Sequence, residues 1–569
     1  MMEGLSASSP CRVAPREWAW VGIAGLLVTV FFSLPYLMGW AHSTPEMAFG
    51  GMLFGLDDMH SYLAKMRYGA RDGWLFRLVY TGEPHAGGFI YPHFLALGKL
   101  AALISGEGAH VSGRTLLIAY HAARVVCGLL LLLVTYRFAA EYLPRPSQRR
   151  LAWALAALAG GLGWIPLVLA LVGRDPSAAN LPVEFYVPEA FGVLSLYGLP
   201  HLALARTLLL GGWLLLFRAG ESGRWQQALL AGALWGGMGL IVPFYAALLG
   251  VLIAAWLAVL GIVRLLLSAG RLRVVWEAGA VARLAALAAV LPALVLGYHV
   301  WLFASDPILA AWAAQNRLPS PPLADYALAY GLLIALAGVG LTREAPRLTQ
   351  RTTLLVVWPT LALALAYAPI NVQRRLLEGV IVPLSILATL GVWRLLGEKP
   401  QQGRLLGWRL RQMGLAALIV LCFPSTFLLV GGGVLTAARP TWPVFHPADE
   451  IAALRWLDEH AAPDSLVLAT AASGNIIPAY AGVRVYVGHG PETIDSERKR
   501  QTAEAFFLGG MTDETRRALL REAGIDYVWI GPPERPPLCT TCFDAAALGL
   551  RLVYQGGEYA IYAVGDGSP

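Results

Sequence analysis

The sequence predicts a polytopic α-helical membrane protein whose C-terminal part forms an α/β domain outside the membrane. Of its 569 residues, 57% are hydrophobic and only 14% are charged, whereas soluble domains carry roughly 25% charged residues. Apolar runs long enough to cross a bilayer follow one another up to residue 437. The net charge of +7 is spread over short loops rather than gathered on one face, which argues against a nucleic-acid partner.

Roughly eleven apolar runs in this part of the chain have a length that suits a membrane span. They lie at about 18–40, 114–138, 151–172, 200–217, 226–243, 246–267, 284–303, 325–341, 352–368, 379–396 and 413–435. A further run at about 89–105 contains Pro92 and is short for a span, which favours a helix lying in the membrane interface. The first run is longer than the core of a signal peptide, so we expect a retained helix.

The basic residues predict which loops face the cytoplasm, because Lys and Arg are enriched in short cytoplasmic loops. Arg12 and Arg16 precede the first run, and clusters of basic residues fill every second loop from the second run onward. The sequence therefore predicts a multi-pass protein of the plasma (inner) membrane with a cytoplasmic N-terminus. The regions expected outside are the loops 41–113, 173–199 and 304–324 and the chain after about 438.

The chain changes character after residue 437, which predicts two domains, a transmembrane domain at 1–437 and an extracytoplasmic α/β domain at 438–569. Prolines mark a linker at the boundary. Short apolar strands alternate with helices beyond it, a pattern that predicts a small, largely parallel sheet. The expected strands are 466–470, 483–487, 527–530 and 560–563, and the expected helices are 449–460, 497–508 and 513–523.

Two adjacent carboxylates, Asp57 and Asp58, follow the first span at or near the water interface. The residues after them have helical spacing, with Tyr62 on one side and Lys65 and Arg67 on the other, which predicts an amphipathic helix on the membrane surface. The helix dipole keeps a carboxylate at a helix N-terminus ionised, and an ionised Asp can act as a general base. The alternative is that Asp57 only caps this helix.

A series of motifs follows in a fixed order over residues 18–138. They are the first span, Asp57-Asp58, Tyr62, Asp72-Gly73-Trp74-Leu75, a turn at Pro92 into an apolar helix, and Arg124 leading into the next full span. In order and spacing these motifs resemble the GT-C glycosyltransferases, in particular the branch of the protein O-mannosyltransferases and the lipid A aminoarabinose transferases. The chain departs from that pattern where Asp58 stands in place of a Glu, and where Phe89-Ile90-Tyr91 stands in place of a basic residue.

The resemblance implies that the transmembrane domain is catalytic and has a GT-C-like fold. The implied reaction is inverting transfer of a sugar from a polyprenyl-phosphate donor in the lipid bilayer to a hydroxyl of a glycan, lipid or protein acceptor on the outer face. By position, Asp57 takes the place of the family's catalytic base and Asp58 that of the neighbouring acid. Tyr62, His93 and Arg124 fall in the region that would bind the substrates.

Arg374 and Arg375 lie in a short connection on the outer side, where the topology does not predict positive charge. Guanidinium groups bind phosphate through paired hydrogen bonds, so both are candidates for binding the donor phosphate. Anchoring to anionic lipid is the alternative. Gln315 and Asn316, in another outer loop, are candidates for binding sugar hydroxyls, and a solvent-facing turn explains them equally well.

Glu189 and His201 lie in the second long outer loop, where related enzymes place a further acid. Together with Asp57 they would supply ligands for Mg²⁺ or Mn²⁺. The alternative is a solvated loop in which these side chains bind no metal, because prolines punctuate it. The sequence requires no cofactor, so a metal-free site and a divalent cation both stay open.

Two further features lie in the outer domain. Cys539 and Cys542 are spaced as Cys-x-x-Cys without the second pair that a zinc site needs, which leaves a local disulfide or two free thiols. His489 follows an expected strand and therefore lies at the carboxyl edge of the sheet, where ligands of parallel sheets often bind. A structural histidine is the alternative.

Two other function classes compete with the enzyme. A transporter or flippase of lipid-linked substrates usually buries ionisable groups near the middle of the membrane. Here the acids gather in the outer loops, and a large outer domain also favours an enzyme. A non-catalytic envelope assembly protein is the other alternative. The chain has no phosphate-binding P-loop and no hydrolase nucleophile motif.

Overall fold

The computed structural model describes residues 12–173, 181–268, 272–344, 349–396, 405–535 and 543–565. These residues form two compact units that interleave along the chain. We call them the helical unit, drawn from Met1–Ser33, Ala123–His299 and Arg317–Gly432, and the mixed unit, drawn from Leu34–Ala122, Val300–Asn316 and Gly433–Pro569. Cys539 and Cys542 lie outside the described residues.

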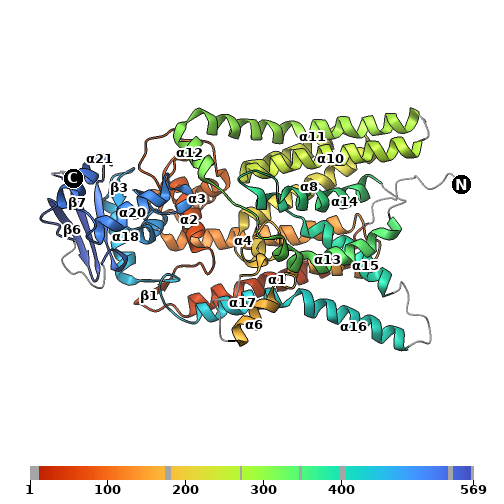
Figure 1. Ribbon diagram of the computed structural model, residues 1–569, viewed down its shortest axis with the longest axis horizontal. Helices are drawn as coiled ribbons and strands as arrows, with labels where there is room; N and C mark the ends of the chain where they lie inside the picture. The colour runs from red at the N-terminus through yellow and green to blue at the C-terminus, as the bar shows by residue number, and fades with distance from the viewer. Residues whose placement is uncertain are drawn as a thin grey trace. The chain divides into compact units, whose positions relative to one another are not determined.

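The helical unit is built almost entirely from apolar helices (Figure 1). It contains most of α1 (Pro15–Ala41), α4 (Gly113–Ala139) and α11 (Leu272–Ser305), together with α5 (Pro146–Leu158), α6 (Trp164–Val172), η3 (Val183–Phe185), α7 (Val193–Tyr197), α8 (Pro200–Ser222), α9 (Trp225–Ile241), α10 (Pro243–Ser268), α13 (Leu323–Glu344), α14 (Gln350–Leu365), η5 (Gln373–Leu377), α15 (Ile381–Leu395), α16 (Leu405–Cys422) and part of α17 (Pro424–Ala437).

Six helices among the described residues are long and apolar enough to cross a membrane. They lie in α1, α4, α8, α10, α11 and α13, and the pair α16–α17, bent by 45°, would be a seventh. The chain is thus a polytopic helical protein, as the sequence predicts. Three further expected runs form shorter helices, because α9, α14 and α15 have only 17, 16 and 15 residues.

The run expected at 151–172 is not one continuous helix. It breaks between α5 and α6 at residues 159–163, where Gly161 has a φ of 94°. A side chain there would meet backbone, since a Cβ on Gly161 would lie 2.2 Å from the carbonyl oxygen of Ala329. Close packing against α13 therefore explains both the glycine and the break in the expected span.

The mixed unit brings the first outer loop together with the C-terminal part of the chain. Its elements are β1 (Met47–Phe49), α2 (Leu56–Arg71), α3 (Pro92–Ser105), η1 (Gly108–His110), α12 (Pro307–Gln315), β2 (Phe445–Pro447), α18 (Ala448–His460), β3 (Leu466–Leu468), α19 (Ala471–Tyr480), β4 (Arg484–Val485), η6 (Gly490–Glu492), α20 (Ser496–Phe507), α21 (Asp513–Glu522), β5 (Tyr527–Ile530), η7 (Pro532–Glu534), β6 (Leu550–Gly556) and β7 (Tyr559–Val564). Strands β1 and β2, about 400 residues apart in sequence, pair antiparallel.

All four strands and three helices expected in the C-terminal part are present, but the sheet is mixed rather than largely parallel. Its order is β4-β3-β5-β7-β6, in which β3 is parallel to β4 and β5, while β7 is antiparallel to both β5 and β6. Strand β6 was not expected from the sequence, because exposed Arg551, Leu552 and Gln555 leave this edge strand without a buried apolar run. Helix α19, which contains Pro478, was also not expected.

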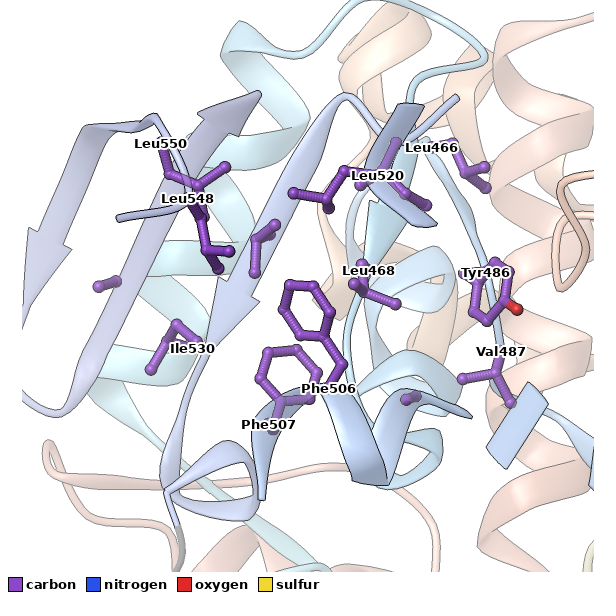
Figure 2. Close-up of a cluster of buried hydrophobic side chains, with 14 residues drawn as sticks. Leu466, Leu468, Tyr486, Val487, Phe506, Phe507, Leu520, Ile530, Leu548 and Leu550 are labelled. Atoms are coloured by element: carbon purple, nitrogen blue, oxygen red, sulfur yellow. The ribbon is translucent and has the colours of Figure 1, made fainter. Parts of the chain in front are cut away.

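The core of the C-terminal part lies between the sheet and the helices α20 and α21 (Figure 2). Phe506 and Phe507, at the end of α20, contact each other edge to face with ring centroids 5.0 Å apart. Leu468 from the central strand and Leu520 from α21 are also buried in this cluster. Each fully buried side chain of this kind contributes about 1.5–3 kcal/mol, so the sheet provides a stable base for the loops at its edge.

Helix α2 is not the surface helix that the sequence predicts. Its charged face is buried, with Lys65 only 1% and Arg67 only 2% exposed. The guanidinium of Arg67 donates to the backbone carbonyl of Ala479 and lies 3.3 Å from the carboxylate of Asp458. The basic face that indicated a solvent-facing surface is therefore paired with groups from the C-terminal part, whose position the local pattern could not reveal.

Candidate functional site

The two candidate acids lie in the first turn of α2. The helix begins after Gly55, which has left-handed backbone angles, φ 54° and ψ 45°, and no side chain caps the helix. The alternative that Asp57 only caps α2 is therefore wrong. Asp57 and Asp58 are both exposed in this first turn.

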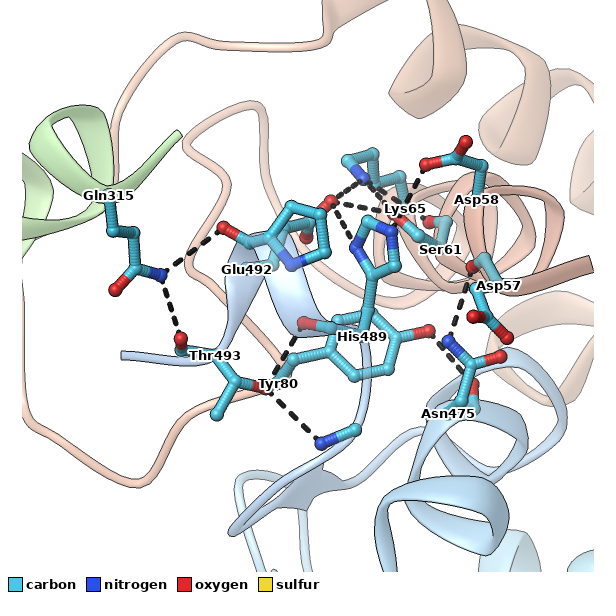
Figure 3. Close-up of polar contacts among 12 residues, drawn as sticks. Asp57, Asp58, Ser61, Lys65, Tyr80, Gln315, Asn475, His489, Glu492 and Thr493 are labelled. Atoms are coloured by element: carbon cyan, nitrogen blue, oxygen red, sulfur yellow. Dashed lines mark hydrogen bonds and ion pairs between the residues drawn. The ribbon is translucent and has the colours of Figure 1, made fainter. Parts of the chain in front are cut away.

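The two acids have different surroundings (Figure 3). His489 Nε2 donates to Asp58 Oδ1 over 3.1 Å, although 60% of the Asp58 side chain is exposed. The Asp57 carboxylate makes no hydrogen bond or ion pair with any residue that the structure describes, and only its backbone carbonyl accepts a bond, from Asn475 over 3.2 Å. Of the pair, Asp57 is the one whose carboxylate is open to a second molecule.

A buried carboxylate lies behind His489. Glu492 Oε1 is 3.3 Å from His489 Nδ1 and accepts hydrogen bonds of 2.6 Å from Ser61 Oγ and from Lys65 Nζ. Lys65 Nζ also donates to Ser61 Oγ, and it lies 4.5 Å from the centroid of the Tyr91 ring. Both charges are removed from water, so their mutual pairing is what makes this burial tolerable.

The pairing changes the protonation of these groups. Burial would lower the pKa of His489, but its contacts with Asp58 and Glu492 outweigh burial and raise this pKa to about 9. Burial would raise the pKa of Glu492, but Lys65 and His489 together hold it well below its ordinary value. At neutral pH the cluster therefore contains an imidazolium between two carboxylates.

Asn475 and Tyr80 surround the same cluster. The side chain of Asn475 accepts from His60 Nδ1 over 2.7 Å, and its backbone carbonyl accepts from the hydroxyl of Tyr80 over 3.0 Å. The Tyr80 ring contacts His489 edge to face, with centroids 5.7 Å apart. These contacts fix α19 and the loop that carries Tyr80 against the start of α2.

Gln315 and Asn316, both expected to bind sugar, lie at the end of α12. The amide nitrogen of Gln315 donates to the carbonyl oxygens of Thr493, over 2.7 Å, and Pro491, over 3.3 Å (Figure 3). Gln315 thus contacts the segment that carries Glu492. Asn316 is the residue that ends the helix.

Three other candidates, two from the first outer loop and one from α4, lie in aromatic or buried surroundings. The Tyr62 ring stacks on Phe94 with centroids 4.8 Å apart, and His93 lies 4.2 Å from the same ring. Arg124, in the helical unit, is buried, and its guanidinium donates to Ser33 Oγ over 2.8 Å. The role of each in binding substrate stays a prediction.

The remaining candidates lie in the helical unit. Arg374 and Arg375 belong to η5, and Arg375 Nε is 3.9 Å from Glu189 Oε1. The Arg375 guanidinium also lies over the ring of Phe244, 5.2 Å from its centroid. His201 is half-buried in the first turn of α8. No group of three or more His, Cys, Asp or Glu side chains suited to a metal ion occurs among the described residues.

The sequence analysis missed Lys65, Ser61, Asn475 and Glu492 as members of the site. One signal was available, because the chain has only four lysines among 43 basic residues. Two of the four, Lys65 and Lys499, are buried and paired with glutamates, at 2.6 Å to Glu492 and 2.7 Å to Glu83. The glutamate partner of Lys65 is more than 400 residues away in sequence, so no local pattern pointed to it.

Most of the chain shares its fold with solved structures of an oligosaccharyltransferase and an arabinofuranosyltransferase. An Archaeoglobus fulgidus oligosaccharyltransferase tethered with an acceptor peptide matches 90% of this chain and 69% of its own, with a TM-score of 0.53 and 14% identity. The same coverage and TM-score, with 13% identity, hold for an oligosaccharyltransferase from this organism in complex with an inhibitory peptide and a dolichol-phosphate. The fold is GT-C-like.

A mycobacterial arabinofuranosyltransferase matches 98% of this chain with a TM-score of 0.50 and 17% identity, and the chain spans 42% of its length. No protein-family model and no curated protein sequence matches the chain. At such low identities the likeness concerns the fold, and confirms the GT-C-like architecture that the motifs imply. The narrower resemblance to the O-mannosyltransferase and aminoarabinose transferase branch stays a prediction.

Proposed function

We propose that this protein is a membrane glycosyltransferase which moves a sugar from a polyprenyl-phosphate donor to an acceptor hydroxyl. The GT-C-like fold supports this class of reaction, since an oligosaccharyltransferase and an arabinofuranosyltransferase are among the solved structures that share it. One of them is in complex with a dolichol-phosphate, a polyprenyl-type lipid phosphate. The observation that carries the proposal is the exposed acid pair at the start of α2. The Asp58 carboxylate is hydrogen-bonded to His489, whereas the Asp57 carboxylate is accessible to a substrate.

In the proposed reaction Asp57 is the general base. Its carboxylate takes the proton of the acceptor hydroxyl while the acceptor oxygen forms a bond to the anomeric carbon of the sugar. The bond between that carbon and the phosphate oxygen breaks, and polyprenyl phosphate leaves with the bonding electron pair. A single displacement of this kind inverts the anomeric carbon. Phosphate is a good leaving group, so orientation and charge stabilisation carry much of the catalysis.

We propose Arg374 and Arg375 as the groups that bind the phosphate of the donor. Arginine presents paired donors that match phosphate oxygens, and both residues are only half-buried. Arg375 is 3.9 Å from Glu189, a distance that leaves its guanidinium incompletely paired. An Arg374→Ala variant is expected to raise the KM for the donor and to leave membrane insertion unchanged.

The proposal places the reaction on the outer face of the plasma membrane, with the N-terminus in the cytoplasm, because the basic loops alternate along the chain. Glu189 and His201 stay the candidate ligands of a divalent cation, and Glu189 Oε1 lies 3.9 Å from Arg375 Nε.

The proposed function is tested by measuring sugar transfer from a panel of defined donors. Purified protein in nanodiscs is incubated with polyprenyl phosphates that carry a radiolabelled hexose or pentose, and sugar released or transferred is measured. An Asp57→Asn variant is expected to lose about 100-fold or more in turnover, the typical contribution of a general base. Asp495→Asn is the matched control, because Asp495 is exposed, forms its ion pair with Arg498, and has a φ of 52° that Asn tolerates well.

Two results would contradict the proposal. One is a folded wild-type protein that processes no member of the panel but moves intact donor across a vesicle membrane, which would indicate a flippase. The other is an Asp57→Asn variant that keeps wild-type turnover, which would exclude Asp57 as the base.

A further inference from the structure

Four charged side chains form a continuous line from the surface to the interior of the mixed unit (Figure 3). Asp58 is at the surface, followed by His489 at 3.1 Å, Glu492 at a further 3.3 Å, and Lys65 at a further 2.6 Å. Exposure falls along this line, from 60% for the Asp58 side chain to 2% for that of Lys65. The line therefore joins an exposed acid of the proposed site to a buried ion pair.

The geometry determines the charge on His489. Nε2 is hydrogen-bonded to Asp58 Oδ1, and Nδ1 lies 3.3 Å from Glu492 Oε1, an ion-pair distance without hydrogen-bond geometry. Carboxylate oxygens only accept hydrogen bonds. A neutral imidazole has one donor and one acceptor nitrogen, so one of the two contacts would be repulsive. Only the doubly protonated imidazolium is attracted to both partners, and with it the four side chains carry two positive and two negative charges.

Among the residues that the structure describes, the other groups near His489 do not offer a competing partner for its charge. Helix α2 contributes Asp57, whose carboxylate is not bonded to the ring, and the neutral His60. The loop before α3 contributes the Tyr80 ring, and α19 contributes the uncharged Asn475. Asp58 and Glu492 are the carboxylates in direct contact with the ring.

We propose that His489 is a positioning residue that holds the Asp58 carboxylate in place and compensates its charge, so that a second anionic carboxylate, Asp57, can stand beside it. This inference rests on the proposed function. It makes the segment of His489 to Glu492 part of the active site, although it lies more than 400 residues after the acid pair. Neither the proton nor the sugar passes through His489, which acts only through Asp58.

The proposal predicts a dependence of transfer on basic pH. The folded-state pKa of His489 is raised above the ordinary value of 6.5 to about 9, so its contribution is fully present below pH 6.5 and is lost as the pH rises through about 9. Wild-type turnover should fall over that range. His489→Gln, which carries no charge at any pH, should have about 10- to 100-fold lower turnover at pH 7.5, as expected for a misplaced carboxylate, and no such decline near pH 9.

The experiment compares wild type, His489→Gln, Asp58→Asn and the double variant in nanodiscs, using the radiolabelled polyprenyl-phosphate panel between pH 6.5 and 10. The KM for the donor should stay within twofold of wild type, because His489 does not contact it. The double variant should have a turnover no lower than that of the slower single variant, because both substitutions break the same contact, the one between His489 and Asp58. His460→Gln is the control, because His460 is an exposed histidine of the same unit whose ring stacks on Trp456.

Thermal unfolding in the same pH series measures the contribution of His489 to stability, and this measurement does not depend on sugar transfer. The difference in melting temperature between wild type and His489→Gln should shrink as the pH rises through about 9. A wild-type protein that transfers no sugar but shows this shrinking difference would refute the proposed function and leave the contact between His489 and Asp58 intact. The inference on His489 would be overturned if wild type is active and the His489→Gln variant has the same turnover and the same pH profile.

Discussion

At the scale of single residues, buried charges in both units are stabilised by specific partners. In the helical unit Arg206 is 1% exposed and lies 2.5 Å from the carboxylate of Glu378. Its remaining donors reach the carbonyl oxygens of Phe191, over 2.8 Å, and of Glu189, over 3.0 Å. A buried pair of this kind contributes little net stability, but the removal of one partner leaves an uncompensated charge. Such residues specify how neighbouring segments pack.

His60 is a buried group whose protonation opposes folding, and it provides the first prediction. Burial, with the charges of His446 and His489, lowers its pKa from 6.5 to about 3. The unfolded chain therefore binds a proton between pH 6.5 and 3 that the folded chain does not, and the free energy of unfolding falls as the pH decreases through this range. Between pH 7 and pH 5, the free energy of unfolding of wild type should therefore fall by about 2 kcal/mol more than that of His60→Gln.

Denaturant unfolding of both proteins at pH 7 and pH 5 measures this difference. The glutamine can keep the hydrogen bond to Asn475, which His60 Nδ1 makes over 2.7 Å, so the variant should fold. His460→Gln, at an exposed position, should keep the wild-type dependence on pH. An equal change in the free energy of unfolding between pH 7 and pH 5 for wild type and His60→Gln would mean that His60 does not stay neutral in the folded protein.

At the scale of elements, α2 is positioned by its close approach to α3. A Cβ on Gly98 would lie 1.8 Å from the carbonyl oxygen of Met66, and a Cβ on Gly69 would lie 2.4 Å from that of Leu95. The two backbones can approach this closely only because glycine stands at the crossing. The position of Asp57 at the start of α2 therefore depends on small residues in two helices.

The second prediction concerns this crossing. Gly98→Ala should lower the free energy of unfolding by about 1–3 kcal/mol, because the methyl group meets backbone that cannot move aside, and this outweighs the better helix propensity of alanine. Sugar transfer should fall with it as α2 shifts. Gly73→Ala is the control, since nothing lies within 4 Å of a Cβ at that position. Equal melting temperatures and equal turnover for the two variants would show that α2 is positioned by other contacts.

Elements with a strong local pattern were predictable from the sequence, and those that depend on distant partners were not. The strands at 466–468 and 527–530 consist of buried apolar residues, and both were expected at these places. Helix α2 was also expected, but the predicted surface environment of its basic face was wrong. Lys65 and Arg67 resemble a solvated face until their partners Glu492 and Asp458 are known. Helix α19, which contains a proline, was not expected from the sequence.

At the scale of the whole molecule, the candidate site draws on three separated parts of the chain. The acid pair comes from α2, His489 and Glu492 from the segment around η6, and Gln315 from the end of α12. The sequence located the acid pair because its motif is local. It gave no indication that His489 belongs with that pair, because contacts over 431 residues leave no periodic signal in a single chain.

The last prediction follows from this shared construction. Removal of the residues after Ala437 would leave Lys65 without Glu492 and Arg67 without Asp458, two buried cations without their partners. A buried charge that loses its partner costs about 3–5 kcal/mol. We therefore expect α2 to unfold locally in the truncated protein, so that trypsin cleaves after Lys65 and Arg67, and sugar transfer to be lost.

Mass spectrometry of short trypsin digests in detergent measures this cleavage. The control is a full-length chain with a specific protease site inserted after Pro440 and cut after folding. The hydrogen bonds and ion pairs of α2 survive that cut, so the nicked protein should resist trypsin at Lys65 and keep its activity. A truncated protein that protects Lys65 as well as the intact chain does would show that α2 folds without the C-terminal part, and that His489 and Glu492 are dispensable for the position of Asp57.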